Sequence, residues 1–184
     1  MRMLAWFVCA MLAGPLLAGA TGRVIDPDGA PISGAEVCEF SDGVALRCVK
    51  VDARGSYTME NPVRPTVLVR ASGFVARTIE AAPLSEPVRL QRAAALAVRV
   101  VDAVSGQPLP SGKVMIDLPS GRRIGDFVPF NKGGVRISTL DPGMVFVRAT
   151  ADGYEAGGPM PIELVGGAEQ SVRIPMTKSH GAER

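Results

Sequence analysis

Apolar and polar residues alternate in short runs along most of the chain after residue 20. In Gly22–Asp26, for example, Val24 lies on one face and Arg23 and Ile25 lie on the other. A period of two predicts a half-buried β-strand. The following Pro27-Asp28-Gly29 has turn chemistry, because Pro restricts φ and Gly accepts a positive φ. No stretch carries a convincing helical period, so the pattern predicts an all-β protein.

The alternating runs fall into two series. The first predicts strands at Gly22–Asp26, Ala35–Phe40, Val44–Val51, Ser56–Met59, Thr66–Ala71, Phe74–Ala81 and Val88–Leu90. After the short link Gln91–Ala95, the second predicts strands near Leu96–Asp102, Lys113–Leu118, Arg123–Val128, Gly134–Ser138, Val145–Thr150, Met160–Leu164 and Gln170–Met176. Many short strands separated by Gly and Pro are typical of a sandwich. We therefore expect two tandem Greek-key β-sandwich domains of about seven strands each.

The two series are also similar in sequence, which indicates an internal repeat. The stretch Gly22–Val37 has an echo in Arg99–Val114. The offset between the copies is 76 residues at Arg23/Arg99, 78 at Arg70/Arg148 and 84 at Arg89/Arg173. It only grows along the chain, as expected if the second copy carries longer loops.

Both copies resemble the carboxypeptidase regulatory-like domain, a transthyretin-like β-sandwich. The shared pattern is Gly-x-Val-x-Asp, Gly-x-Pro-[Ile/Leu], Gly-Ala-x-Val, Asp-x-x-Gly-x-[aromatic] and a Gly-[Phe/Tyr] corner. The first copy keeps every element, whereas the second departs at Ser111-Gly112-Lys113 and at Phe130-Asn131-Lys132-Gly133. The resemblance implies the fold, but it implies little about function, since this module is an accessory in many unrelated proteins.

Residues 1–20 have the layout of a secretory signal peptide. Met1–Met3 is a short basic head, Leu4–Leu17 is an apolar run, and Ala18–Ala20 is a small-x-small cleavage site. The alternative is an uncleaved anchor, but the run is shorter than the about 20 residues that a membrane span needs. We therefore expect no membrane span after cleavage and a periplasmic or secreted protein. The expected divisions are signal peptide 1–20, β-sandwich domains 21–92 and 93–178, and a disordered tail at 179–184.

The balance of charge does not favour binding to polyanionic surfaces. Loss of Arg2 with the signal leaves 19 basic and 18 acidic residues. A nearly neutral protein without basic blocks is not suited to nucleic acid or to anionic membrane surfaces.

Candidate catalytic and metal-binding residues are sparse. The one histidine, His180, lies in the expected tail, and no Ser-His-Asp or Cys-His set can be assembled around it. Asp26, Asp28 and Asp52 could supply oxygen ligands to Ca²⁺. In Asp-Pro-Asp-Gly and Asp-Ala-Arg-Gly, however, turn capping is the ordinary role of Asp. We expect no enzyme activity, no metal and no cofactor.

The expected function is a non-catalytic module for protein binding or envelope assembly. Its partner would be an unidentified envelope or extracellular protein, bound through loops or an exposed strand edge. A carbohydrate-binding module is the alternative, although glycan sites usually need exposed aromatic rings and the only Trp, Trp6, leaves with the signal. Arginines at matched strand positions should face solvent and could bind anionic glycans or acidic partners, or could simply be a solvated face. The candidate surface residues are Arg23, Arg70, Arg89, Arg99, Arg148 and Arg173, with Phe127 and Phe130 as an apolar patch or as hairpin core.

A disulfide between Cys38 and Cys48 is expected, because these are the only cysteines left after cleavage and the compartment is oxidising. They lie five residues on each side of Gly43. A hairpin loop of three or five residues would place them directly opposite each other, whereas a two-residue Asp42-Gly43 loop would pair Cys38 with Arg47. The second copy has Met115 near the first of these positions and no cysteine, so its hairpin should be held by packing alone.

Overall fold

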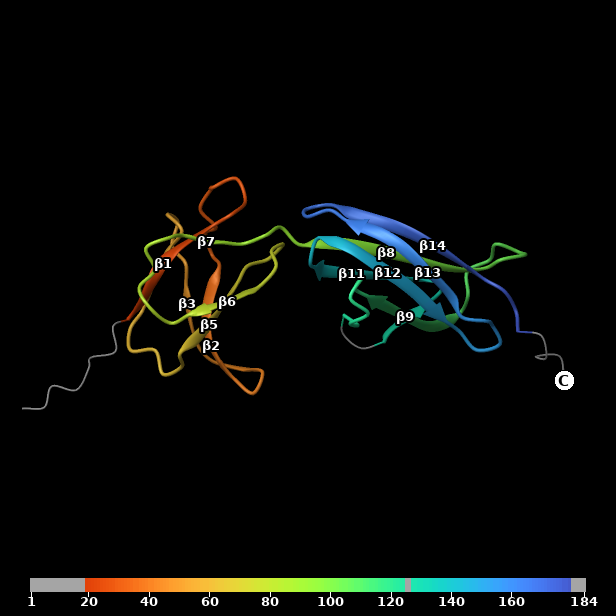
Figure 1. Cartoon of the computed structure of the whole chain (residues 1–184), viewed down its shortest axis with the longest axis horizontal. Helices are drawn as coiled ribbons and strands as arrows, with labels where there is room; N and C mark the ends of the chain where they lie inside the picture. Colours follow the sequence, from red (N-terminus) through yellow and green to blue (C-terminus); the bar gives the residue numbers. More distant parts are fainter. Residues whose placement is uncertain (1–18, 125–126, 180–184) are drawn as a thin grey trace, which may run out of the picture.

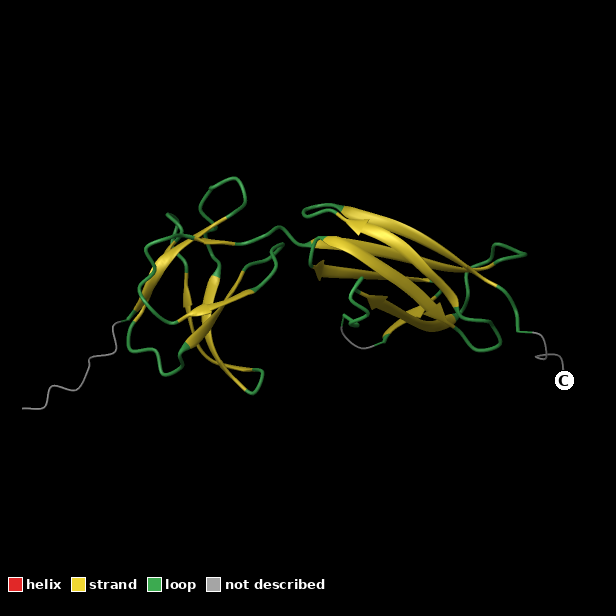
Figure 2. Ribbon diagram, in the orientation of Figure 1, coloured by secondary structure: helices red, strands yellow, loops and turns green. Residues whose placement is uncertain are grey.

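The computed structural model describes residues 19–124 and 127–179 (Figure 1). Every regular element in these residues is a β-strand (Figure 2), which confirms the all-β prediction. None of the described residues therefore forms a helix that could cross a membrane. Most of the predicted signal peptide, His180 and most of the predicted tail lie outside the described residues.

The N-terminal half contains seven strands in two sheets. A three-stranded sheet has the order β4-β1-β7, and a four-stranded sheet has the order β3-β2-β5-β6. Apolar side chains from both sheets, among them Val24, Val37 and Val69, form one buried cluster. The strands are β1 (Ala20–Ile25), β2 (Glu36–Ser41), β3 (Val44–Lys50), β4 (Ser56–Met59), β5 (Thr66–Arg70), β6 (Arg77–Glu80) and β7 (Val88–Arg89).

The C-terminal half repeats this strand order. Its order β11-β8-β14 corresponds to β4-β1-β7, and β10-β9-β12-β13 corresponds to β3-β2-β5-β6. A single pair, Asn131 with Gly134, links β10 to β11 and joins the two sheets into one seven-stranded sheet around a second buried cluster. The strands are β8 (Ala94–Asp102), β9 (Ser111–Asp117), β10 (Val128–Asn131), β11 (Gly134–Leu140), β12 (Gly143–Thr150), β13 (Gly157–Leu164) and β14 (Glu169–Met176).

Two details of the predicted alignment are wrong. The strand expected at Arg123–Val128 is placed differently: Arg123 forms an isolated bridge with Asp117, and strand β10 runs from Val128 to Asn131. Arg89 and Arg173 are not equivalent, because Arg89 is level with Ile25 whereas Arg173 is level with Arg99. Alternation defines which face a side chain occupies, but it does not define how far one parallel strand slides along its neighbour.

The link between the halves is fastened at Arg92 and Ala93. The Arg92 guanidinium lies 2.9 Å from Asp26 Oδ2 and 2.7 Å from Asp28 Oδ2. The backbone of Ala93 donates to Gly73 O at 2.8 Å and accepts from Gly167 N at 2.9 Å. The link is thus bonded to residues on both sides of it.

The disulfide between Cys38 and Cys48 is present, with Cα atoms 4.1 Å apart. The expected odd-length loop is wrong, because Ser41 pairs with Val44 and the turn is the two-residue Asp42-Gly43. A β-bulge makes the two findings compatible: Glu39 pairs with Arg47 but Phe40 pairs with Ala45, so β3 carries one additional residue. The bulge shifts the register by one and brings the cysteines opposite each other.

An ion pair occupies the corresponding place in the C-terminal half. Cys38 is the β2 partner of Leu68, and Asp117 is likewise the β9 partner of Phe146. Asp117 bridges to Arg123 Nε at 3.2 Å and to Arg148 Nε at 3.4 Å. The expectation that this hairpin is held by packing alone is therefore wrong, since a charged brace replaces the covalent one.

We expect the two braces to differ in strength. Cys38→Ala/Cys48→Ala should lower the free energy of unfolding by about 2–3 kcal/mol, because a short covalent loop is lost. Arg123→Ala should cost only about 0.5–1 kcal/mol, since its ion pair is partly solvated. Urea unfolding of the oxidised proteins measures both values. Reductant should lower the free energy of unfolding only in the wild type and in Arg123→Ala, because only these two proteins contain the disulfide. Two reactive thiols in unreduced wild-type protein would rule out the disulfide.

Candidate binding surfaces

The carboxylates of Asp26 and Asp52 accept hydrogen bonds from backbone N–H groups of their own turns. Asp26 Oδ1 accepts the N–H groups of Asp28 at 2.9 Å and Ala30 at 2.8 Å. Asp52 Oδ1 accepts those of Arg54 and Ser56, both at 2.8 Å. These contacts are the turn-capping role considered from the sequence.

Asp102 is the counterpart of Asp26 in the C-terminal half, and its side chain has different hydrogen-bond partners. Asp102 Oδ1 accepts from the backbone N–H and hydroxyl of Ser105 at 2.7 and 3.0 Å, and Tyr154 donates its hydroxyl to Asp102 Oδ2 at 3.0 Å. Hydrogen bonds from Ser105, followed by those from Tyr154 and Val104, outweigh burial and lower the pKa of Asp102 to about 2. Burial raises the pKa of Asp26, but its N–H partners and Arg92 together hold that pKa below its usual value.

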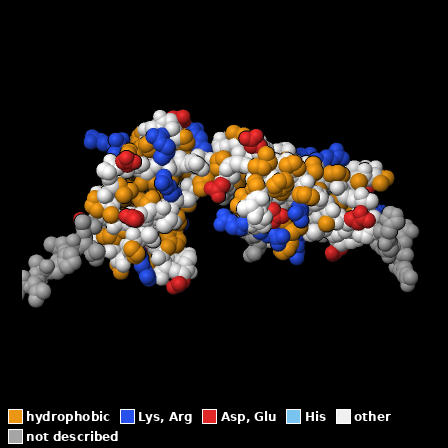
Figure 3. All heavy atoms as spheres, viewed as in Figure 1, with side chains coloured by type: hydrophobic (Ala, Val, Ile, Leu, Met, Phe, Trp, Pro, Cys, Tyr) orange, Lys and Arg blue, Asp and Glu red, His pale blue; other side chains and the backbone are white. Residues whose placement is uncertain are grey.

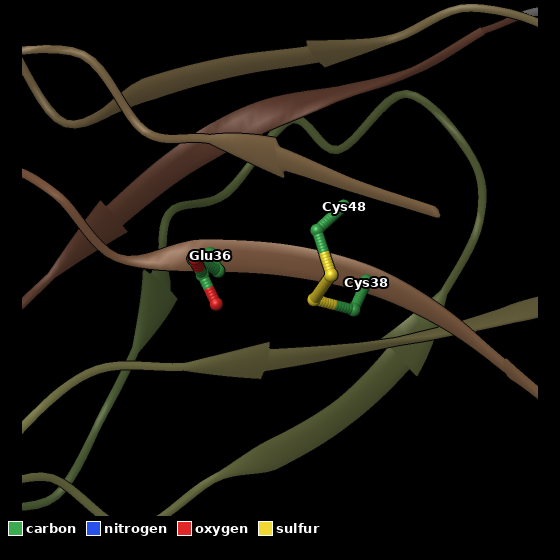
Figure 4. A group of neighbouring side chains, drawn as sticks. All are labelled: Glu36, Cys38 and Cys48. Carbon is green, nitrogen blue, oxygen red and sulfur yellow. A yellow bond between two sulfur atoms is a disulfide. The ribbon is translucent and has the colours of Figure 1, made fainter. Parts of the chain in front are cut away.

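One group of side chains superficially resembles a metal site. Potential ligand atoms of Glu36, Cys38 and Cys48 all lie within 4.8 Å of one another (Figure 4). The two sulfurs are joined to each other, so neither can act as a thiolate ligand. The Glu36 carboxylate is held by Arg70 Nε and Nη2 at 2.9 and 2.7 Å. This group is a structural brace.

The six candidate arginines are all exposed, as strand alternation predicts. Their partners differ. Arg70 binds Glu36 and Arg148 binds Asp117. Arg89 donates to the carbonyl oxygens of Asp26 and Pro27, and Arg23 donates to that of Arg54. Within residues 19–124 and 127–179, neither Arg99 nor Arg173 has an acidic partner. Basic and acidic side chains are interspersed on the face drawn in Figure 3.

The two candidate phenylalanines have different environments. Phe130 is only 3% exposed and belongs to the core, so its suggested place on a binding surface is wrong. Its side chain points inward from β10 and covers Gly112 of the neighbouring strand. Phe127 is 46% exposed, with Lys113 Nζ 5.4 Å and the Arg123 guanidinium 5.1 Å from its ring centre. Two flanking cations leave it a poor open platform for a sugar ring.

The most unusual buried residue is Glu39, which is 2% exposed. Its carboxylate accepts the backbone N–H groups of Val63 and Arg64 and pairs with Arg47 Nε at 3.2 Å. Arg47 Nη2 in turn donates to Glu60 O at 2.8 Å. Glu39 is not among the residues predicted from the sequence, although an acid at an inward position of an alternating strand was a usable signal.

This anchorage places apolar side chains on the surface. Val63 is 79% exposed, Val44 is 63% exposed and Leu46 is 55% exposed. The loop and the hairpin that carry them are joined through Glu39, and also through Arg64, which donates to the Ser41 hydroxyl at 2.8 Å. We refer to Val44, Leu46 and Val63 as the hairpin patch.

The hairpin patch borders an open sheet edge. Among the described residues, β3 pairs only with β2, so the other side of its seven residues has no strand partner there. β6 and β4 are shorter edges of four residues each, and β7 has two residues. β13 contains Pro159 and Pro161, which lack the N–H needed for pairing. β10, the counterpart of β3, is paired with β11. β3 is thus the longest edge strand of the N-terminal half, and it contains no proline.

One family model matches the first half of the chain. Residues 19–94 match the sequence model of the carboxypeptidase regulatory-like domain. No such match covers the second half, and no curated protein matches the sequence.

Several solved structures are similar to this chain. They include the Bacillus anthracis TIE protein (15% identity, TM-score 0.43, 88% of this chain and 34% of that one) and a streptococcal ancillary pilin (15%, 0.44, 90% and 63%). GBS52, the minor pilin of Streptococcus agalactiae, has 15% identity and a TM-score of 0.40 over 87% of this chain and 96% of its own. The chain thus spans less than two thirds of the first two structures. At these scores no property of the pilins is transferred to it.

Two glutamates on β2 allow a matched test of burial. Glu39→Ala should destabilise the protein by about 3–5 kcal/mol, because Arg47 loses its partner and two N–H groups are left unpaired. Glu36→Ala removes an exposed arginine pair from the same strand and should cost about 0–1 kcal/mol. Urea unfolding compares them, and equal costs would contradict the anchoring role of Glu39.

The environment of Asp102 predicts an acid-sensitive contribution. Because its folded pKa of about 2 lies below the ordinary 3.8, the carboxylate stabilises the fold above about pH 4. That contribution should fade as pH falls from 3.8 toward 2. The stability difference between wild type and Asp102→Asn should therefore shrink over this range in denaturant titrations. Asp152→Asn, which removes an exposed carboxylate from the same half, is the control. A constant Asp102→Asn difference down to pH 2 would refute the assignment.

Proposed function

We propose that this chain is an exported, non-catalytic β-sandwich protein that binds a protein partner in the envelope or outside the cell. The observation that carries this proposal is the open β3 edge beside the hairpin patch. The Cys38–Cys48 disulfide supports an oxidising compartment, periplasmic or extracellular. We further propose two domains, at 21–92 and 93–178, and that both are carboxypeptidase regulatory-like. The match at 19–94 and the recurrent strand order support this division.

The proposed contact combines backbone and side-chain recognition. An unpaired edge presents N–H and C=O groups to which an extended segment of a partner can add as a further strand. Exposed apolar side chains next to such an edge supply buried area and side-chain selectivity. The bulge and the disulfide hold the register of β3, so the edge is preorganised for a partner strand.

The chemistry of the turns favours binding over catalysis. Asp26 and Asp52 are occupied by backbone N–H groups and Asp102 by Ser105 and Tyr154. The one exposed aromatic ring among the described residues, Phe127, is flanked by cations, which supports a protein partner over a glycan.

The test is a comparative capture from the native envelope, followed by reconstitution with the purified partner. Val44→Ser/Leu46→Ser/Val63→Ser should weaken binding of that partner by tenfold or more, since buried apolar contacts carry much of such interfaces. Val104→Ser/Val165→Ser, which removes exposed valines elsewhere, is the matched control and should bind like the wild type.

Equal binding by the hairpin-patch variant and the control would reject the proposed surface. Selective micromolar binding in a glycan array, unaffected by the hairpin-patch substitutions, would favour the carbohydrate-binding alternative. Hydrolase activity that is lost on changing Asp26 or Asp52 would overturn the non-catalytic assignment.

A further inference from the structure

A group of three cations lies on the opposite half of the chain from the hairpin patch. Arg99 on β8 and Arg173 on β14 are level with each other in a parallel pair. Lys132 lies in the turn between β10 and β11. All three line one open hollow of about 420 Å³, whose other lining residues are Val101, Gly106, Pro108, Gly133 and Gly134. We call Arg99, Lys132 and Arg173 the cation triad.

None of the described residues that line the hollow is acidic. Within the described residues, none of the three cations forms an ion pair or a side-chain hydrogen bond, whereas Arg70, Arg92, Arg123, Arg136 and Arg148 are all paired with acids. Like charges that face each other across neighbouring strands are unfavourable. An anion bound between them would relieve this repulsion.

The N-terminal half has basic residues at two of the three positions of the cation triad, but no third cation at the position of Arg173. Arg23 and Arg54 occupy the positions of Arg99 and Lys132, since Arg23 pairs with Ser56 and Arg99 with Gly134. Arg23 donates to the Arg54 carbonyl oxygen at 3.4 Å. The remaining arginine, Arg89, lies further along β7 and is bound to carbonyl oxygens.

The two halves also differ in the acidic residues near these basic positions. Asp52 lies two residues before Arg54, and the residue two before Lys132 is Phe130. Asp28 lies two residues after Asp26, and the residue two after Asp102 is Val104. The C-terminal half therefore keeps the basic positions and loses two nearby carboxylates, which makes its hollow more positive.

The floor of the hollow is kept open by small residues. The Arg173 guanidinium lies against Gly106, where an added Cβ would be 3.3 Å from Nη2. Gly133 has φ of 76°, and a Cβ there would come within 2.3 Å of Pro108 Cβ. Gly106 thus allows the Arg173 guanidinium to lie against the lining, and Gly133 allows the backbone to pack closely against Pro108.

From this geometry we infer that the cation triad binds a tetrahedral oxyanion, a phosphate or sulfate group. Arg presents its donors in a planar fork that matches two oxygens of such a group, and Lys adds a point charge. A volume of about 420 Å³ falls in the range of small-molecule sites, so the group can be a free ion or an ester on a larger molecule. This inference does not depend on the protein partner proposed for β3.

The test is titration of the ¹⁵N-labelled protein with inorganic phosphate and, separately, inorganic sulfate, at constant ionic strength. The amide signals of Gly106, Gly133 and Gly134 should shift and saturate. Arg99→Gln/Arg173→Gln should weaken binding by about tenfold or more, because two charge-assisted contacts are lost. Arg23→Gln/Arg54→Gln is the matched control and should bind like the wild type. Unchanged remaining signals establish that both variants are folded.

A sulfated disaccharide provides the second arm. Tighter binding than inorganic sulfate would identify an ester as the source of the oxyanion, and equal binding would identify the free ion; both support the site. Shifts that do not saturate, or that are the same in wild type and Arg99→Gln/Arg173→Gln, would overturn it. An equal loss of binding in the Arg23→Gln/Arg54→Gln control would overturn it as well.

Discussion

The register between β2 and β3 determines which side chains brace the N-terminal hairpin. A slip of one residue would move every side chain of β3 to the opposite face. The bulge sets the register that places Cys48 opposite Cys38 and Arg47 opposite the buried Glu39. It follows that the disulfide and the contact between Arg47 and Glu39 both depend on one additional residue in one strand.

The two halves show how one strand order tolerates different solutions to the same local problem. The hairpin is braced by a disulfide in one half and by Asp117 with Arg123 in the other. The carboxylate after the first strand is held by Arg92 in one half and by Tyr154 in the other. Since each exchange preserves a cross-strand or cross-loop contact, the backbone order survives while the surface chemistry diverges.

Much of this fold could be predicted, because period-two alternation and Gly or Pro turns are local signals. Strand β4 has the predicted bounds, and most others end within two or three residues of them. The errors arise from non-local effects. The pairing of the cysteines across a two-residue turn at Gly43 depended on a bulge. The position of Arg173 depended on the parallel register. The burial of Phe130 depended on which face of β10 meets the core. The anchoring by Glu39 required knowing that the 60–64 loop returns to β2, which spacing alone does not reveal.

The disulfide and the ion pair also differ in the conditions under which they form. An ion pair between Asp117 and Arg123 forms as soon as the backbone does, in any redox environment. The sulfur bridge between Cys38 and Cys48 waits for an oxidant. During synthesis in a reducing interior, the C-terminal hairpin would already be held while β3 could still change its register. Oxidation of the two cysteines is therefore the event that commits the N-terminal hairpin to one arrangement, and the β3 edge takes its final register only in an oxidising compartment.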